Sequence, residues 1–355
     1  MVLLAAGLAS CKDDPKPVEE LPALGTPLSL ESSLLYVPTE EVEESEAVLL
    51  DLKSGRVTRE ALPEGKVHAY PRADHPGQAL LLTEGASAKL EDAGVSEAVP
   101  SHVLIVDAEG AQKRFVLSAR YSELSLSEDG RYAIAYGPSG SWATSDNIAV
   151  IDLDAPGEEQ EVGTTSVRAL DGQGPSAIAF SPASGRRRLA VLVMTDAVNV
   201  IDLEQPALRD KVLPLKLPNA AAALRAKKVL FAGDHCFVQP DRGNDVIAVS
   251  FEDDTSARGF HAALSTLGTE SALQDIALLD ESGDPRLLTL GDGSLRVIDT
   301  LSGAGESSGT SNKYGAAHVF QGTSPFDGES RTRALLYTPS DSRLGFVDLQ
   351  AELPG

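Results

Sequence analysis

Cysteine is nearly absent from this sequence, because its 355 residues contain only Cys11 and Cys236. Two thiols allow one disulfide at most, which excludes a small secreted scaffold held together by several bridges. Glycine and proline are plentiful instead, with 31 and 21 copies, in a chain that is 42% hydrophobic. This composition is typical of a folded, turn-rich protein rather than a disordered one.

Positive charge is also scarce. The chain has 30 Lys and Arg against 53 Asp and Glu, which gives a formal net charge of -23. A field of this sign repels phosphate backbones, so no nucleic acid is expected as a partner. Solubility is the simplest role for the excess of acidic residues, and a bound cation or a basic protein partner are the alternatives.

Several catalytic and metal-binding signatures are missing. No H-E-x-x-H motif, no H-x₃₋₅-H pair, no phosphate-binding P-loop and no C-x-x-C-H haem attachment motif occurs. The six histidines are dispersed along the chain, at His68, His75, His102, His235, His261 and His318. The sequence therefore assigns no catalytic, cofactor-binding or metal-binding residue.

Two short stretches still contain residues that could form a reactive or ligand-binding site. Residues 233–236 read GDHC, where His235 and Cys236 would suit a thiolate or a soft-metal site. Adjacent strand residues point to opposite faces, so we expect Cys236 to be a buried structural residue instead. Residues 184–189 read SGRRRL and place three arginines at a hairpin turn. We favour a salt-bridging patch there over a small anion site.

The N-terminus reads MVLLAAGLASC, and its apolar run is too short to span a bilayer. The tetrad that ends at Cys11 resembles the lipobox of bacterial lipoproteins. The resemblance implies a signal peptide over 1–10, lipidation of Cys11, and a lipidated tether over 11–25. The usual Lys or Arg near the start is missing, which departs from the family pattern. The alternative is a fortuitous apolar N-terminus with an ordinary cysteine.

Short β-rich runs recur along the chain, and most of them end in Asp. The closing residues are Asp51, Asp107, Asp152, Asp202, Ser250, Asp299 and Asp348, with gaps of 56, 45, 50, 48, 49 and 49 residues. Seven copies at a period near 50 predict a repeat fold of strands, and the period favours propeller blades. Each recurrent Asp is expected to accept hydrogen bonds from backbone amides of the following turn.

The fourth copy of the repeat shows its predicted strands most clearly. Four strands are predicted over 175–185, 189–195, 198–203 and 208–217, with the third sandwiched between neighbouring blades. The third copy reads similarly and ends with EEQEVGT as its fourth strand. The stretch AVLVMTDAVNVIDLEQP resembles the YVTN-type β-propeller repeat, and SLSEDG and FSPASG resemble turns of that family and of TolB-type propellers. No Trp-Asp dipeptide is present, so the WD40 signature itself is missing.

We therefore predict an all-β fold, a seven-bladed β-propeller of four-stranded antiparallel blades, as a single domain over 26–355. A strand from 26–31 or 33–37 is expected to complete the last blade and leave no open edge. Acidic insertions lie at 38–46 and 84–101, and 219–228 is predicted to form a short helix.

The function expected from these features is a non-catalytic binding or scaffold module that acts through propeller loops. The lipobox resemblance places it in the bacterial cell envelope, anchored to a membrane and facing the periplasm or exterior. An envelope protein or polymer is the expected partner, no cofactor is expected, and the protein is expected to be a monomer. The alternative is a propeller-type enzyme, lactonase or quinoprotein-like, with a site at the central channel.

Overall fold

The computed structural model describes residues 24–38, 45–85, 90–91, 94–95, 99–137, 147–167, 174–183, 185, 187–204, 212–216, 224–253, 260–269, 272–279, 286–300, 303–310, 312–323, 330–338 and 344–349. All regular structure in these ranges is β-strand, which confirms the all-β prediction. None of it includes a helix long and apolar enough to cross a membrane. The predicted signal peptide, Cys11 and most of the tether lie outside the described residues.

Seven sheets of three to five strands follow one another along the described chain. Sheet 1 contains β1 (Leu28–Leu30), β2 (Ser33–Tyr36), β3 (Glu46–Asp51) and β4 (Val57–Ala61). Sheet 2 contains β5 (Val67–Pro71), β6 (Ala79–Thr83), β9 (His102–Asp107), β10 (Gly110–Leu117) and β14 (Glu159–Val162). Sheet 3 contains β11 (Glu123–Leu126), β12 (Tyr132–Tyr136), β13 (Asn147–Asp152) and β15 (Thr165–Ser166).

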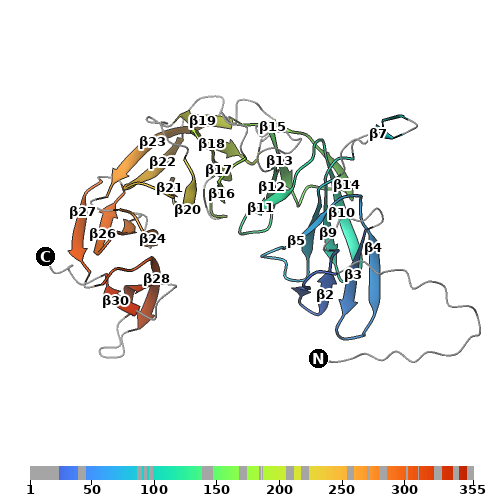
Figure 1. The fold of residues 1–355 in the computed structure, drawn as a ribbon, viewed down its shortest axis with the longest axis horizontal. Helices are drawn as coiled ribbons and strands as arrows, with labels where there is room; N and C mark the ends of the chain where they lie inside the picture. The colour runs from blue at the N-terminus through green and yellow to red at the C-terminus, as the bar shows by residue number, and fades with distance from the viewer. Residues whose placement is uncertain are drawn as a thin grey trace, which may run out of the picture.

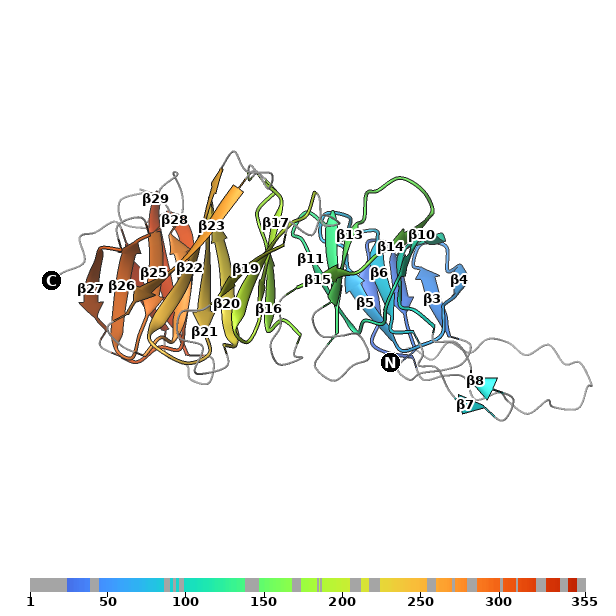
Figure 2. The same cartoon turned by 90° about the horizontal axis from the view of Figure 1, so that it is seen from above.

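The remaining sheets repeat this pattern. Sheet 4 contains β16 (Ala177–Phe180), β17 (Leu189–Val193), β18 (Ala197–Asp202) and β19 (Val212–Lys216). Sheet 5 contains β20 (Ala226–Ala232), β21 (His235–Pro240), β22 (Asp245–Asp253) and β23 (Phe260–Gly268). Sheet 6 contains β24 (Asp275–Leu279), β25 (Arg286–Leu290), β26 (Ser294–Asp299) and β27 (Gly305–Gly309), and sheet 7 contains β28 (Ala316–Thr323), β29 (Ser330–Tyr337) and β30 (Leu344–Asp348). A small hairpin, β7 (Leu90–Glu91) and β8 (Gly94–Val95), lies apart from these sheets (Figure 2).

The sheets stand side by side in an arc, as in a β-propeller (Figure 1). The first strands, such as β5, β16 and β24, line the concave side, and the fourth strands, such as β19 and β27, lie on the convex side. Strands β6, β17 and β18 are buried along their whole length. They are sandwiched between neighbouring sheets, and β18 thereby confirms the position predicted for the strand over 198–203.

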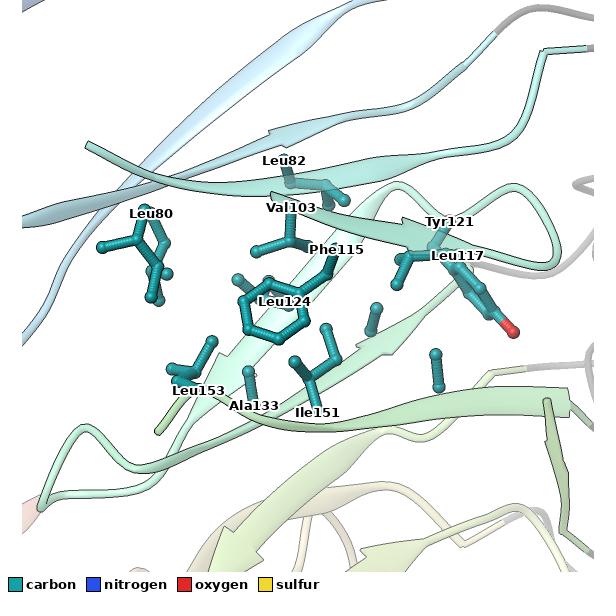
Figure 3. Packing of buried hydrophobic residues seen from close by; sticks show 13 residues of the cluster. Leu80, Leu82, Val103, Phe115, Leu117, Tyr121, Leu124, Ala133, Ile151 and Leu153 are labelled. Carbon is teal, nitrogen blue, oxygen red and sulfur yellow. The ribbon is translucent and has the colours of Figure 1, made fainter. Parts of the chain in front are cut away.

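Apolar clusters fill the six seams between consecutive sheets. The alternation of side chains along β6 shows how one strand serves two of these seams. Ala79 and Leu81 pack toward sheet 1, whereas Leu80 and Leu82 pack toward sheet 3. In the seam with sheet 3, Phe115 meets residues of sheet 3 such as Ile151 (Figure 3). Each inner sheet is therefore covered on both of its faces.

Charged side chains also cross the seams. Arg72 of sheet 2 is only 5% exposed, and it donates to the carbonyl oxygen of Gly130 (2.8 Å) and to the carboxylate of Asp154 (2.6 Å) in sheet 3. At the opposite face of the arc, Asp275 of sheet 6 accepts from Lys228 of sheet 5 (3.1 Å) and from the backbone N–H of Ala317 in sheet 7 (2.9 Å). These contacts join sheet 2 to sheet 3 and sheet 6 to both of its neighbours.

The prediction that the recurrent Asp residues stabilise turns is confirmed for four of the six. Backbone amides two residues further on donate to the Oδ1 atoms of Asp51 (2.7 Å), Asp107 (2.8 Å), Asp152 (3.1 Å) and Asp202 (3.1 Å). The Ser54 amide also donates to Asp51 (2.8 Å), and the bonds from the Ser54 and Lys53 amides lower the pKa of this carboxyl. The face of the arc on which the third strands end is called the aspartate face below.

Two predictions about strand order are wrong. The N-terminal strands do not complete the last sheet, because β1 and β2 form a hairpin through Glu31 and Ser32 and belong to sheet 1. This short-range pairing forms in place of a long-range one, and the described part of sheet 7 has three strands. The EEQEVGT stretch is not the fourth strand of the third copy. Its central residues form β14, which pairs in parallel with β10 of sheet 2, and β15, which follows this stretch, takes the fourth place in sheet 3.

The Arg72 contact generates a stability prediction. Replacing Arg72 with Leu removes three charged hydrogen bonds and leaves the buried Gly130 carbonyl without this donor, so we expect a loss of about 2 to 3 kcal/mol. Arg59→Leu is the control, because the Arg59–Glu46 pair is exposed and should contribute less than about 1 kcal/mol. Urea unfolding of both variants measures the difference. Equal losses would show that Arg72 does not hold the seam.

Candidate functional site

The six histidines do not converge. His68, His75 and His102 belong to sheet 2 and its turns, His235 and His261 to sheet 5, and His318 to sheet 7. Only His68 has a carboxylate partner among the contacts described, since its Nε2 lies 2.6 Å from Glu84. No group of His, Cys, Asp and Glu in the described ranges is spaced to hold a metal ion.

The GDHC stretch forms the turn from β20 into β21. Gly233 has φ 54°, which suits glycine, and the side chains of His235 and Cys236 then point to opposite faces. Cys236 is completely buried in the seam of sheets 4 and 5, and burial raises the pKa of its thiol. His235 is half-buried and stacks on Phe237, and burial lowers its pKa. The two residues do not share a site, and Cys236 is structural, as predicted.

The arginines of the SGRRRL turn form ion pairs across two seams. Arg187 reaches Asp253 of sheet 5 (2.9 Å), and Arg188 reaches Asp129 of sheet 3 (2.5 Å). Burial raises the pKa of Asp129, but hydrogen bonds from Ser127, the Arg131 amide and Arg188 outweigh it and lower the pKa overall. The salt-bridging interpretation is confirmed for Arg187 and Arg188, and Arg186 lies outside the described residues.

The insertions contribute little to a described site. Residues 39–44 and most of 86–98 lie outside the described residues or have no described side chains. The helix predicted over 219–228 is wrong in its last part, because β20 begins at Ala226. Lys228 pairs with Gln239 of β21, so cross-strand hydrogen bonding overrides the local helical preference. Residues 219–223 lie outside the described residues.

No serine-hydrolase nucleophile elbow is expected from the sequence, although one stretch matches the letters of its motif. Residues 305–309 read GESSG and match the G-x-S-x-G pattern. That pattern needs a sharp strand-to-helix turn that exposes the serine at the top of a sheet. Here the five residues are β27, the outer strand of sheet 6, paired along its length with β26. The match is therefore not a nucleophile elbow.

A hollow of about 230 Å³ opens on the aspartate face, at the seam of sheets 4 and 5. Leu189, Phe231, Phe251 and Phe260 form its apolar lining, and Phe231 and Phe251 stack with ring centroids 6.0 Å apart. The charged lining residues are Arg187, Asp234, Glu252 and Asp253. This binding hollow combines an aromatic floor with a carboxylate rim, which suits a ligand with an apolar body and a positive charge.

The aromatic residues of the binding hollow are missed by motif searches, because they come from three strands. One signal was present in the repeat itself. The third strands of sheets 1, 3 and 4 are followed by Leu52, Leu153 and Leu203, each directly after an Asp. In the fifth copy Ser250 and Phe251 stand at these two positions. A departure from the repeat marks the place where the hollow forms.

The burial of Cys236 generates a prediction for thiol chemistry. In a Cys11→Ala chain, Cys236 should react with an aromatic disulfide reagent only after unfolding, because the folded thiol is buried and its raised pKa keeps it protonated. Absorbance of the released thiolate measures the reaction in buffer and in guanidinium chloride. Rapid reaction of the folded chain would contradict the structural role.

Comparisons with known proteins add the following. No protein-family model matches the chain, and no curated protein matches it. Among solved structures, the dihydro-heme d1 dehydrogenase NirN in complex with DHE is 18% identical, with a TM-score of 0.43 over 81% of this chain and 54% of that one. This chain thus matches about half of that protein. A chain of the mitotic checkpoint complex is 15% identical, with a TM-score of 0.39 over 98% of this chain and 99% of that one.

Proposed function

We propose that this protein is a non-catalytic binding or scaffold module of the bacterial cell envelope, built as a seven-bladed β-propeller and anchored by a lipid on Cys11. The observation that carries the binding function is the hollow on the aspartate face, where Phe231, Phe251 and Phe260 lie beside three carboxylates. The contacts between sheets, such as Arg72 to Asp154, support a rigid platform for that surface. The partner is an envelope protein.

A closed ring is part of this proposal, and the first and last sheets support it. The five large hydrophobic residues that are most exposed in the described chain all lie in these two sheets and their flanks: Leu24, Leu52, Val57, Leu344 and Phe346. Phe346 is 68% exposed and shares a face of sheet 7 with Leu335, its cross-strand partner. In sheet 1 the cross-strand pair Leu34 and Leu50 faces away from sheet 2. Packing these two faces together forms a seventh seam like the other six.

The envelope address rests on the lipobox resemblance at Leu8 to Cys11. A thioether-linked diacylglyceryl group and an N-terminal acyl chain together give stable anchoring, whereas one chain alone binds a membrane reversibly. The charged, proline-containing stretch after Cys11 then acts as a solvated tether between the lipid and the propeller. The protein acts as a monomer on this tether.

One observation favours the enzyme alternative. His68 and Tyr70 lie on the same face of β5, and His68 contacts Glu84 at 2.6 Å. Burial raises the pKa of Tyr70 to about 12, and the nearby Glu123 carboxylate adds to this shift. Lactone hydrolysis by the purified protein that is lost in His68→Ala would replace the binding proposal with this one.

The lipid anchor is tested by intact-mass analysis of protein purified from its native membrane. The expected mature species begins at Cys11 and carries added acyl mass, because the thiol is the acceptor of the lipid. A Cys11→Ala chain should lack both the cleavage and the added mass. An unmodified wild-type chain that starts at Met1 in the soluble fraction would refute the anchor and the envelope address.

The closed ring is tested by placing a charge in the proposed seventh seam. Phe346→Asp should destabilise the protein by at least about 2 kcal/mol, because the closed ring buries this carboxylate without a partner. Ser265→Asp, on the exposed outer strand β23, is the matched control and should change stability by less than about 0.5 kcal/mol. Denaturant unfolding measures both. A Phe346→Asp effect as small as that of the control would show that this face stays open to solvent.

A further inference from the structure

We propose that the binding hollow between sheets 4 and 5 receives an arginine side chain from a partner protein. This inference rests on the proposed binding function and names the chemistry of the group that is bound. The volume of about 230 Å³ is below the range of about 300 to 1,000 Å³ that holds cofactors and drug-sized molecules. A hollow of this size fits one extended side chain better than a large ligand.

The floor of the hollow suits the alkyl stem and the flat head of arginine. Phe231 is the partly exposed ring of the floor, and it stacks on the buried Phe251 with an interplanar angle of 16°. Phe260 is 1% exposed and already lies under the guanidinium of Arg187. Aromatic faces attract cations through their negative quadrupole, and guanidinium stacks on them more readily than ammonium does. The apolar walls cover the methylene groups while the charged head stays at the rim.

The rim supplies the complementary charge. Asp234, Glu252 and Asp253 contribute three negative charges to the lining and Arg187 contributes one positive charge, which leaves a balance of -2. Asp253 is paired with Arg187 at 2.9 Å, so a second cation would be held chiefly by Asp234 and Glu252. The chain's net charge of -23 also attracts a basic partner from a distance.

The protein already shows this mode of binding in its own contacts. The guanidinium of Arg187 lies 5.6 Å from the ring centroid of Phe260 while it pairs with Asp253. A partner arginine would repeat this arrangement against the neighbouring ring and carboxylates. The pairing of Arg187 with Asp253 also argues against an anion as the ligand, because the cation that would attract it is neutralised.

Saturation-transfer NMR of the full-length chain tests the site with a defined probe. The peptide acetyl-Gly-Gly-Arg-Gly-Gly-amide should receive magnetisation on its arginine methylene protons, and the same peptide with neutral citrulline should bind at least about fivefold more weakly. Asp234→Asn/Glu252→Gln should weaken arginine-peptide binding by a similar factor. Phe231→Leu, which keeps apolar bulk but removes the ring, should weaken it while the melting temperature stays near that of the wild type.

Matched charge removal elsewhere on the same face is the control. Glu161→Gln/Glu204→Gln removes two carboxylates from a separate hollow of about 490 Å³ beside sheet 3, and should leave peptide binding unchanged. Equal binding of the citrulline peptide, or equal loss in this control, would overturn the proposed site. Free arginine methyl ester that binds as tightly as the peptide would overturn the assignment to a partner protein.

Chemical cross-linking in the native envelope separates failure of the site from failure of the binding function. Loss of a wild-type cross-linked partner in Asp234→Asn/Glu252→Gln supports the site. Capture of the same partner by both chains would overturn the site and leave the binding function standing. Absence of any cross-linked partner with the wild-type chain would overturn both.

Discussion

Each inner sheet of this protein depends on a neighbour at both of its faces. The middle strands are apolar on both sides, as β6 and β17 show, so no sheet could bury its side chains alone. Six seams of this kind join the seven sheets of the arc (Figure 1). The outer faces of sheets 1 and 7 differ from the other faces, because they carry apolar side chains that no neighbouring sheet covers in the described chain. Phe346 and its neighbours have the composition of a seam without the partner that a seam requires.

Polar contacts between the sheets act in addition to this apolar packing. Arg72 satisfies a carbonyl and a carboxylate of the next sheet, and Asp275 joins sheet 6 to both of its neighbours. A buried carboxylate or guanidinium is tolerated only where several partners surround it, so these residues also fix the rotation of one sheet against the next. Apolar packing supplies the attraction between the sheets, and the charged contacts restrict how the sheets can be placed.

The repeat could be predicted from the sequence because short segments of neighbouring residues determine it. An apolar run, an Asp and a turn recur at nearly constant spacing, and the Oδ1 contacts of Asp51, Asp107, Asp152 and Asp202 show the physical reason. The pairing of strands also depends on residues that are far apart in the sequence, and two predictions about pairing were wrong. The β14 strand joins sheet 2 although it follows the third strand of sheet 3, and its pairing with β10 connects residues that are far apart in the sequence. The place of β1 in sheet 1 follows from a short hairpin that the repeat pattern does not encode.

The candidate site is harder to predict for a related reason. Arg187 of sheet 4 meets Phe231 and Phe260 of sheet 5 only because the two sheets pack together. Ser250 and Phe251, which replace the usual Asp and Leu of the repeat, could have indicated the position of the hollow. A repeat fold retains its common residues where packing and turns require them, so a position that differs suggests another role. Loss of the Asp at that turn removes a local acceptor, and a larger ring replaces the usual Leu. Phe251 packs in the seam of sheets 4 and 5 and also lines the hollow, so this departure from the repeat changes both the core and the surface. Function in such a fold is best sought where one copy differs from the rest.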